Sequence, residues 1–234
     1  MSDRTPAERL RRNVVACRRC PRLVAFRENG MPRAAFADQE YWRKPVPGFG
    51  DVDGRLLVLG LAPAFSGGNR TGRPFTGDSS GRFLLKALHS CGYANQPVSE
   101  SMNDGLVYTD CYVTAAVKCA PPGDRPSPSE FDNCAGYLDE EIALMKRLRV
   151  VLALGALSFR AYLDHLRRAG HQVSGTTFRH GLVGRFDGAP TVVGSYHPSP
   201  RNTNTGKLTQ TMLVHAVRLA RKECGEGESH SKDN

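Results

Sequence analysis

Short apolar segments alternate with longer amphipathic segments along this chain, and that alternation constrains the fold more than any other feature. Residues 55–59 and 150–154 are short and apolar, as is typical of buried strands, and residues 191–195 predict another strand. Residues 106–117 are rich in β-forming side chains and predict a further strand. Strands that alternate with helices pair in parallel and carry helices on both faces. The sequence therefore predicts an α/β fold, in which ligands bind beyond the carboxyl ends of the strands.

The segments between and after these strands have the spacing of amphipathic helices. Residues 79–90, for example, carry apolar side chains at helical intervals. Ser129 is the expected N-cap of the helix predicted at residues 129–148, after the strand at 106–117. The Gly- and Pro-rich residues 29–54 predict a long loop, and the polar residues 225–234 predict a flexible tail. The predicted helices are residues 6–16, 79–90, 129–148, 156–169 and 205–221.

The chain is basic, with 32 Lys and Arg against 23 Asp and Glu and a formal net charge of +9. Such a balance favours a polyanionic partner, because phosphate contacts release counterions, although a merely soluble basic protein would carry the same charge. The first residues contain no apolar signal-peptide core. The longest apolar run, residues 150–154, is too short to span a bilayer. We therefore expect a soluble, cytoplasmic protein that does not bind membranes.

Four of the seven cysteines have the spacing of a metal site. Cys17 and Cys20 form a C-x2-C pair, and Cys119 and Cys134 lie far along the chain. An odd number of cysteines in a reducing compartment argues against a disulfide framework. Two close and two distant thiolates can complete a tetrahedral site, which fits structural zinc or an iron–sulfur cluster. The spacing alone does not decide between these metals.

The loop after the first strand, residues 60–77, has the composition of a ligand-binding loop. Its glycines allow backbone N–H groups to approach a ligand closely, but it lacks the G-K-[ST] ending of a phosphate-binding P-loop. Phe75 either anchors the loop in the core or offers a stacking platform for a base. Asp78 stands just before a helix, where capping is the favoured interpretation and holding a water molecule is the alternative.

The loop after the last strand begins H-P-S-P-R-N at His197. Its two prolines restrict the path of the backbone. His197 could donate a hydrogen bond to charge that develops on a leaving group. Ser199, Arg201 and Asn202 could contact phosphates or a groove edge. A lone histidine usually has only local partners, but a stiff loop at the carboxyl end of a strand favours a functional role.

Taken together, these motifs resemble the family 5 uracil-DNA glycosylases of the uracil-DNA glycosylase superfamily. The shared motifs are C-x2-C, G-L-A-P-A, N-R-T-G-R-P-F-T-G-D, K-C-A-P-P and H-P-S-P-R-N-T-N-T-G, in this order over roughly residues 17–219. The resemblance implies a three-layer α/β/α sandwich around a four-stranded parallel sheet, and a single glycosylase domain over residues 1–224. It also implies a structural [4Fe-4S] cluster whose ligands are Cys17, Cys20, Cys119 and Cys134.

The resemblance also assigns roles to individual residues. Family 4 has an acidic residue where Leu61 stands, so the water-activating role is expected to fall to Asp78 in family 5. Family 4 has a base-reading Asn at the position of Ala115, so we expect a less strict pocket that accepts hypoxanthine and xanthine as well as uracil. Asp124 stands where the resemblance leads us to expect Asn, and this second carboxylate is a further candidate catalytic residue.

These roles combine into an expected mechanism. The target nucleotide must be flipped out of the duplex before its base can be attacked. We expect Phe75 to stack on the base and His197 to stabilise the charge on the departing base. Backbone groups around Leu61 and Ala62, next to Gly60, would bond the polar edge of the base. No lysine nucleophile is required, so we expect a monofunctional enzyme. The predicted DNA contacts are Asn69, Arg70, Ser199, Arg201 and Asn202.

Two other interpretations remain open at the level of the sequence. A non-enzymatic metal protein with four cysteine ligands could bind DNA through its charge, but that would leave the G-L-A-P-A and H-P-S-P loops unexplained. A small-molecule hydrolase on the same scaffold would act on free nucleosides and bind DNA weakly.

The expected partner is single- or double-stranded DNA that contains uracil or another deaminated base, and the expected oligomeric state is a monomer.

Overall fold

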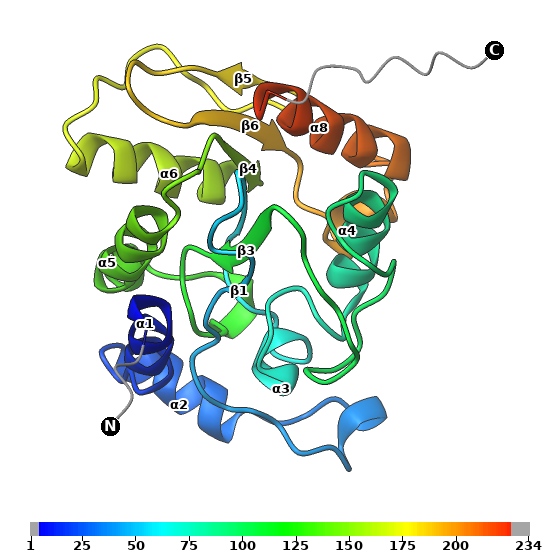
Figure 1. The fold of residues 1–234 in the computed structure, drawn as a ribbon. Coiled ribbons are helices and arrows are strands. Elements are labelled where there is room, and N and C mark those ends of the chain that lie inside the picture. Colours follow the sequence, from blue (N-terminus) through cyan, green and yellow to red (C-terminus); the bar gives the residue numbers. More distant parts are fainter. Residues whose placement is uncertain (1–4, 226–234) are drawn as a thin grey trace.

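The structure, a computed structural model, describes residues 5–225, which form one sheet with helices on both faces (Figure 1). The strands are β1 (Phe49–Gly50), β2 (Leu56–Gly60), β3 (Cys111–Ala115), β4 (Val150–Leu154), β5 (Val183–Gly184) and β6 (Thr191–Ser195). The α-helices are α1 (Pro6–Val15), α2 (Pro21–Asn29), α3 (Gly68–Thr71), α4 (Ser79–Ser90), α5 (Pro128–Leu144), α6 (Ala156–Arg168), α7 (Pro200–Thr203) and α8 (Gln210–Glu223). Two short 3-10 helices are η1 (Ala34–Phe36) and η2 (Pro122–Asp124).

The sheet has the strand order β1-β3-β2-β4-β6-β5. Its four central strands, β3, β2, β4 and β6, are all parallel, and this confirms the expected four-stranded parallel sheet. The edge strands β1 and β5 pair antiparallel to their neighbours and were not predicted. Each spans only two residues, which is too short to leave a periodic pattern in the sequence.

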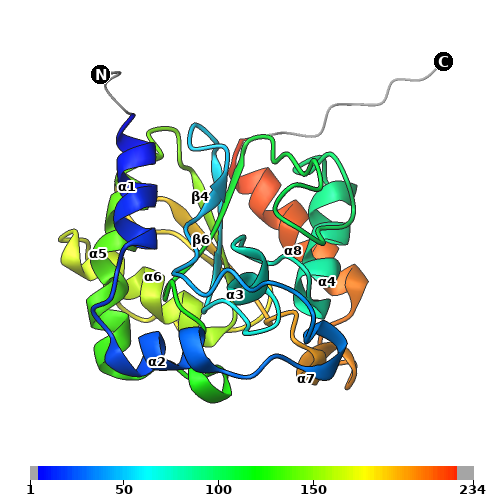
Figure 2. The same ribbon diagram turned by 90° about the horizontal axis from the view of Figure 1, so that it is seen from below.

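Alternate residues of the central strands enter two separate cores. Leu56 and Val58 pack with residues of α4 and α8 on one face of the sheet. Leu57 and Leu59 pack with residues of α5 and α6 on the other face. Figure 2 shows the sheet between these two helical layers, with α1 beside α5 on the outside. The three-layer sandwich is therefore confirmed, and the period of two along β2 accounts for it.

Two helix starts differ from the sequence-based prediction. Helix α5 begins at Pro128, and its N-cap is Ser127 rather than Ser129. Proline is favoured in the first turn of a helix, and Ser127 and Glu130 form a reciprocal capping box. The last long helix begins at Gln210, not at residue 205, because Thr209 caps it by accepting a hydrogen bond from the Met212 N–H.

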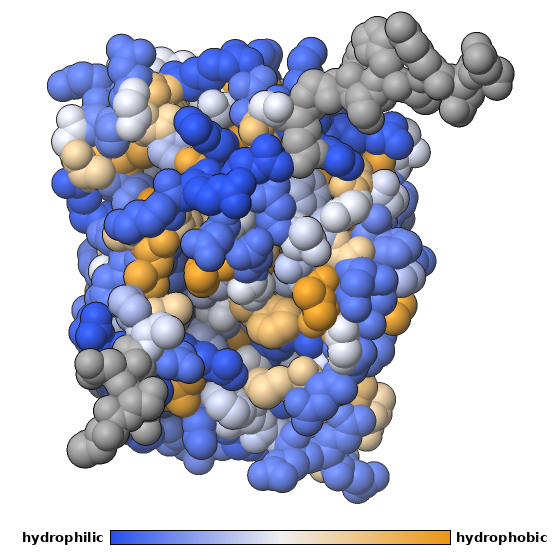
Figure 3. Space-filling view, in the orientation of Figure 1, coloured by the Kyte–Doolittle hydropathy of each residue, from blue (hydrophilic) through white to orange (hydrophobic). Residues whose placement is uncertain are grey.

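Helix α2 was not predicted, because its apolar residues form one short run, 23–26, and do not recur at helical spacing. Over residues 5–225, no helix combines the length and the apolar character that a bilayer span requires. On the face seen in Figure 3, hydrophilic residues dominate and hydrophobic residues form small separate groups. Residues 226–234, most of the predicted flexible tail, lie outside the described residues.

Candidate active site

A pocket opens at the carboxyl edge of the sheet, where the loops after β2, β3 and β6 meet. It encloses about 410 Å³, including its open mouth. Five residues predicted to act on the base or sugar line it together: Ala62, Phe75, Asp78, Ala115 and His197. The other lining residues are Val46, Pro63, Ala64, Pro74 and Ser80. The parallel sheet accounts for this convergence, since its strands end at one edge.

Asp78 is at once a helix cap and a wall of the pocket. Its Oδ1 accepts a hydrogen bond from the Gly81 N–H at 2.8 Å, which makes Asp78 the N-cap of α4. Its Oδ2 lies against Gly67, where an added Cβ would come within 1.9 Å of that oxygen. Burial raises the pKa of Asp78, and the hydrogen bonds from Gly81 and Ser80 oppose this shift. The two roles considered for Asp78 are therefore compatible in geometry.

Phe75 is held in a strained conformation with its ring beside the sheet. Its φ is +50°, a left-handed value that costs a residue other than glycine roughly 1–3 kcal/mol. A Cβ on Gly60 would lie 2.7 Å from the Phe75 ring, so only glycine allows the ring to come so close. The centroids of the Phe75 and His197 rings are 6.2 Å apart. The ring therefore lies between the end of β2 and the loop after β6.

Arg73 anchors the loop that carries Phe75, and its role was not predicted from the sequence. Its side chain is 2% exposed. Its Nε donates to Thr76 Oγ1 at 2.9 Å, and its Nη2 donates to Ser99 Oγ and to the Asp104 carboxylate at 2.7 Å. An arginine in a polar loop is normally expected at the surface. Here the guanidinium instead ties the Phe75 loop to residues 99–104.

His197 is neutral in this site. Burial lowers the pKa of His197 to about 4. A neutral imidazole still carries one N–H donor. The Asn202 side chain donates to the His197 carbonyl at 2.8 Å, which fixes the backbone of the loop. Gly155, at the end of β4, lies so close that a Cβ there would come within 3.3 Å of the His197 Cβ.

Two of the predicted DNA contacts require correction. Asn69 is fully buried, and its Nδ2 donates to the Arg27 carbonyl at 3.3 Å. Arg70 uses its guanidinium within the loop, where it donates to the Ser66 and Gly77 carbonyls and to Gln39 Oε1. Both residues lie in α3, where the loop folds back on itself, so their side chains bond within the protein.

The loop after β6 carries the other three predicted DNA contacts. Arg201 is exposed on α7, and Ser199 is half-buried directly before this short helix. Asn202 is half-buried, and its amide is engaged with the His197 carbonyl. Arg201 is therefore the member of this group whose side chain is most available to a partner.

Three further predicted residues lie at or beyond the edge of the pocket. The carbonyls of Gly60 and Leu61 accept hydrogen bonds from the Ala116 and Val117 N–H groups at 3.0 and 2.9 Å, which extends the pairing of β2 with β3. Leu61 does not line the pocket. Asp124 is exposed on η2 with a φ of +56° and does not line the pocket either. The geometry therefore gives no support to a catalytic role for Asp124.

The four cysteines predicted to bind metal line one cavity of about 290 Å³ between α2, the end of β3 and α5. Cys20, Cys119 and Cys134 are buried, and Cys17 is half-buried. Arg27 Nη1 donates to Cys119 Sγ at 3.1 Å, and Asn133 Nδ2 donates to Cys20 Sγ at 3.4 Å. Burial raises the pKa of Cys119 to about 12 and that of Cys134 to about 11, so a bound cation is needed to hold them as thiolates.

The chemistry of these donors bears on what they could hold. Four thiolates can bind zinc or the irons of an iron–sulfur cluster. The N–H donors to Cys119 Sγ and Cys20 Sγ would compensate negative charge on the sulfurs. The four thiols around one cavity therefore fit a metal group that is bound through sulfur.

Comparison with known proteins agrees with this geometry. The model of the family described as "Uracil DNA glycosylase superfamily" matches residues 47–221. A type-5 uracil-DNA glycosylase of Thermus thermophilus is 45% identical, over 91% of this chain and 95% of its own length. The type-5 uracil-DNA glycosylase of Pyrobaculum aerophilum is 46% identical, over 91% of each chain. A type-4 uracil-DNA glycosylase of Thermotoga maritima is 30% identical, over 75% of this chain and 81% of its own length.

The fold, the pocket and these similarities together define the class of protein. The chain belongs to the uracil-DNA glycosylase superfamily, a family of hydrolases that act on N-glycosyl bonds. Within this superfamily it is a member of the type-5 branch, since the identity to type-5 enzymes holds over nearly the whole chain. This confirms the resemblance to family 5 found in the sequence motifs.

Proposed function

We propose that this chain hydrolyses the N-glycosidic bond of uracil in DNA, and also that of hypoxanthine and xanthine, and leaves the DNA strand unbroken. The observation that carries the proposal is the convergence of Phe75, Asp78 and His197 on one pocket at the carboxyl edge of the sheet. An aromatic ring can stack on a base, a carboxylate can orient water, and a neutral imidazole can donate a hydrogen bond to the departing base.

The base enters the pocket after its nucleotide has been flipped from the helix, which costs a few kcal/mol and least at a mismatch. Phe75 stacks on the flipped base, an interaction worth roughly 1–3 kcal/mol. The left-handed backbone of Phe75 and the bonds that Arg73 makes prevent the ring from moving aside. Because Ala115 presents a methyl group, it places no hydrogen-bonding side chain against the base, and this supports acceptance of several deaminated bases.

Bond cleavage separates charge, and two residues are positioned to stabilise it. The departing base carries negative charge, toward which the neutral imidazole of His197 donates its N–H. The sugar gains oxocarbenium character, as in other glycoside hydrolysis. Asp78 offsets that positive charge and orients the attacking water through the carboxylate oxygen beside Gly67. Within residues 5–225 the pocket lining contains no lysine, which supports hydrolysis without a covalent lysine adduct.

Cys17, Cys20, Cys119 and Cys134 would hold a [4Fe-4S] cluster. When bound, the cluster supplies four iron–thiolate bonds that join distant parts of the chain, and its role is structural. The buried Arg27 guanidinium compensates negative charge on the cysteine sulfurs through its bond to Cys119. Asn133 does the same at Cys20 from the rim of the cavity.

A panel of labelled oligonucleotides, each with one damaged base, tests the proposal. We expect free base and an alkali-labile abasic site from uracil, hypoxanthine and xanthine, with no strand break before alkali. Release of uracil alone would limit the proposal to a strict uracil enzyme. DNA binding without release of any base would support the alternative of a non-enzymatic metal protein.

A further inference from the structure

Lys118 is a fully buried lysine that the proposed reaction does not use. Its side chain is 1% exposed and follows the carboxyl end of β3. Its Nζ donates to Glu141 Oε2 at 2.6 Å, to Thr114 Oγ1 at 2.7 Å and to the Ala115 carbonyl at 2.8 Å. An ammonium group has three N–H donors, so these contacts satisfy all of them.

The main chain of Lys118 makes a further contact. Its carbonyl accepts a hydrogen bond from the Val46 N–H at 2.7 Å. Ala115 and Val46 both line the base pocket, whereas Lys118 itself lines the cysteine cavity. One residue therefore contacts two walls of the pocket and the neighbouring cysteine site.

Stability does not explain why this position carries a charge. A buried ion pair often stabilises a protein no more than apolar residues of the same shape, because both ions lose their hydration. Glu141 is itself only 3% exposed, and its two carboxylate oxygens also accept from the Thr114 hydroxyl at 3.0 Å. What an apolar replacement could not do is hold the Ala115 carbonyl in a fixed direction.

We propose that Lys118 is a positioning residue that fixes the wall of the base pocket formed by Ala115 and Val46. The inference rests on the proposed function, since it concerns how the same pocket binds its base. Ala115 has no side chain beyond its methyl group, so the position of that wall depends on its backbone. The ammonium of Lys118, oriented by Glu141 and Thr114, holds the Ala115 carbonyl and thereby fixes the fit of the wall against the base.

The test replaces both members of the ion pair, because removing one alone would leave an unpaired buried charge. Lys118→Met/Glu141→Gln should raise the KM for a uracil-containing oligonucleotide about tenfold. The Kd for an undamaged oligonucleotide of the same length should not change. KM does not depend on the fraction of correctly folded enzyme, so a merely structural role would lower the maximal rate and leave KM unaltered.

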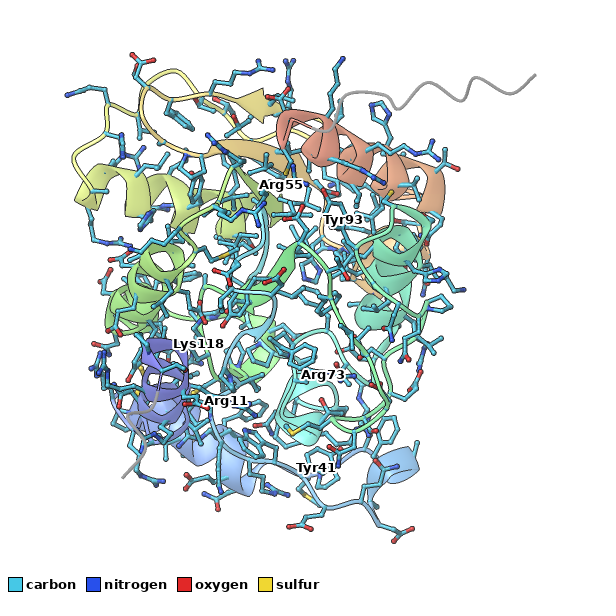
Figure 4. The ribbon with its side chains drawn as sticks, in the orientation of Figure 1. Arg11, Tyr41, Arg55, Arg73, Tyr93 and Lys118 are labelled. Carbon is cyan, nitrogen blue, oxygen red and sulfur yellow. The ribbon has the colours of Figure 1, made fainter. Side chains whose placement is uncertain are left out.

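Arg55 and Asp110 provide a control pair at the opposite end of the parallel strands, with Arg55 Nη2 2.7 Å from Asp110 Oδ2. Figure 4 labels Arg55 and Lys118, which lie well apart in the view. Arg55→Met/Asp110→Asn should lower the midpoint of thermal unfolding without changing KM. An unchanged KM in Lys118→Met/Glu141→Gln would overturn the inference, and so would an equal rise in the control pair.

A second variant serves if the double variant does not fold. Thr114→Val keeps both charges and removes the hydroxyl that lies between them, and it should raise KM about threefold; an unchanged KM would again overturn the inference. Wild-type protein that releases no base would refute the proposed function, and the inference would fall with it. If the wild type releases uracil and the variants have the same KM as the wild type, the inference about Lys118 is refuted and the proposed function stands.

Discussion

At the scale of single residues, the site depends on groups held away from their ordinary states. His197 is neutral because desolvation in the pocket wall lowers its pKa, Phe75 has a left-handed backbone, and Arg73 is buried with its guanidinium paired. Each is held by neighbours that the sequence does not reveal, such as the Asn202 amide on the His197 carbonyl. Groups held in unusual states often mark a functional site, and here they surround one pocket.

The lowered pKa of His197 predicts how stability depends on pH. An unperturbed histidine titrates near pH 6.5, whereas burial lowers the pKa of His197 to about 4 in the folded chain. As the pH falls between these values, the unfolded chain binds a proton that the folded chain does not, so the free energy of unfolding decreases. His197→Gln removes this contribution. Urea denaturation at about pH 7 and pH 4.5 should therefore show a smaller loss of stability in the variant than in the wild type, and equal losses would contradict the burial of a neutral imidazole.

At the scale of elements, the loop after β2 and the start of α4 are interlocked around Asp78. The carboxylate caps α4 through one oxygen, and its other oxygen fits against the backbone of Gly67. The Arg70 guanidinium closes the loop by donating to the Gly77 carbonyl beside Asp78. The position of the proposed water-orienting group is thus set by the packing of a loop on a helix terminus.

Gly67→Ala tests this arrangement. The added Cβ would come within 1.9 Å of Asp78 Oδ2 and should displace the carboxylate. Because misplacement by about 1 Å can cost roughly a hundredfold in rate, we expect kcat for uracil release to fall by about ten- to a hundredfold while DNA binding persists. Gly136→Ala is the matched control, since Gly136 lies exposed in α5 with open space around it. The control should keep full activity and gain about 0.5–1 kcal/mol of stability.

Residues of α2 and α5 line the cysteine cavity together. We therefore expect the loss of one cysteine to affect both the bound cluster and the stability of the fold. Cys134→Ser should abolish the broad visible absorbance of a cysteine-ligated cluster and lower the midpoint of thermal unfolding. Cys91→Ser is the control, because Cys91 is buried in a core outside the cavity, and it should retain its iron. Metal analysis and absorbance spectra decide the outcome. A colourless wild-type protein with stoichiometric zinc would contradict the cluster.

At the scale of the whole molecule, the sequence predicted what depends on local pattern. The strands at 150–154 and 191–195 and the helix at 79–90 were predicted with the bounds that the structure has. Residues 150–154 form an unbroken apolar run, and residues 79–90 keep apolar side chains at helical spacing. The convergence of Phe75 and His197 followed from the parallel sheet. The sequence does not reveal which polar side chains are buried, since burial depends on contacts between distant segments. Asn69 and Lys118 are buried by such contacts, and nothing in their own neighbourhoods signals it.

Release of uracil from DNA by this pocket is measured with a single oligonucleotide assay. Free uracil is quantified after incubation of a uracil-containing oligonucleotide with wild-type protein and with Asp78→Asn, which keeps a side chain able to cap α4. We predict release by the wild type and a rate lower by roughly a hundredfold in the variant, with DNA binding retained. No release by the wild type, or equal release by both proteins, would contradict the account.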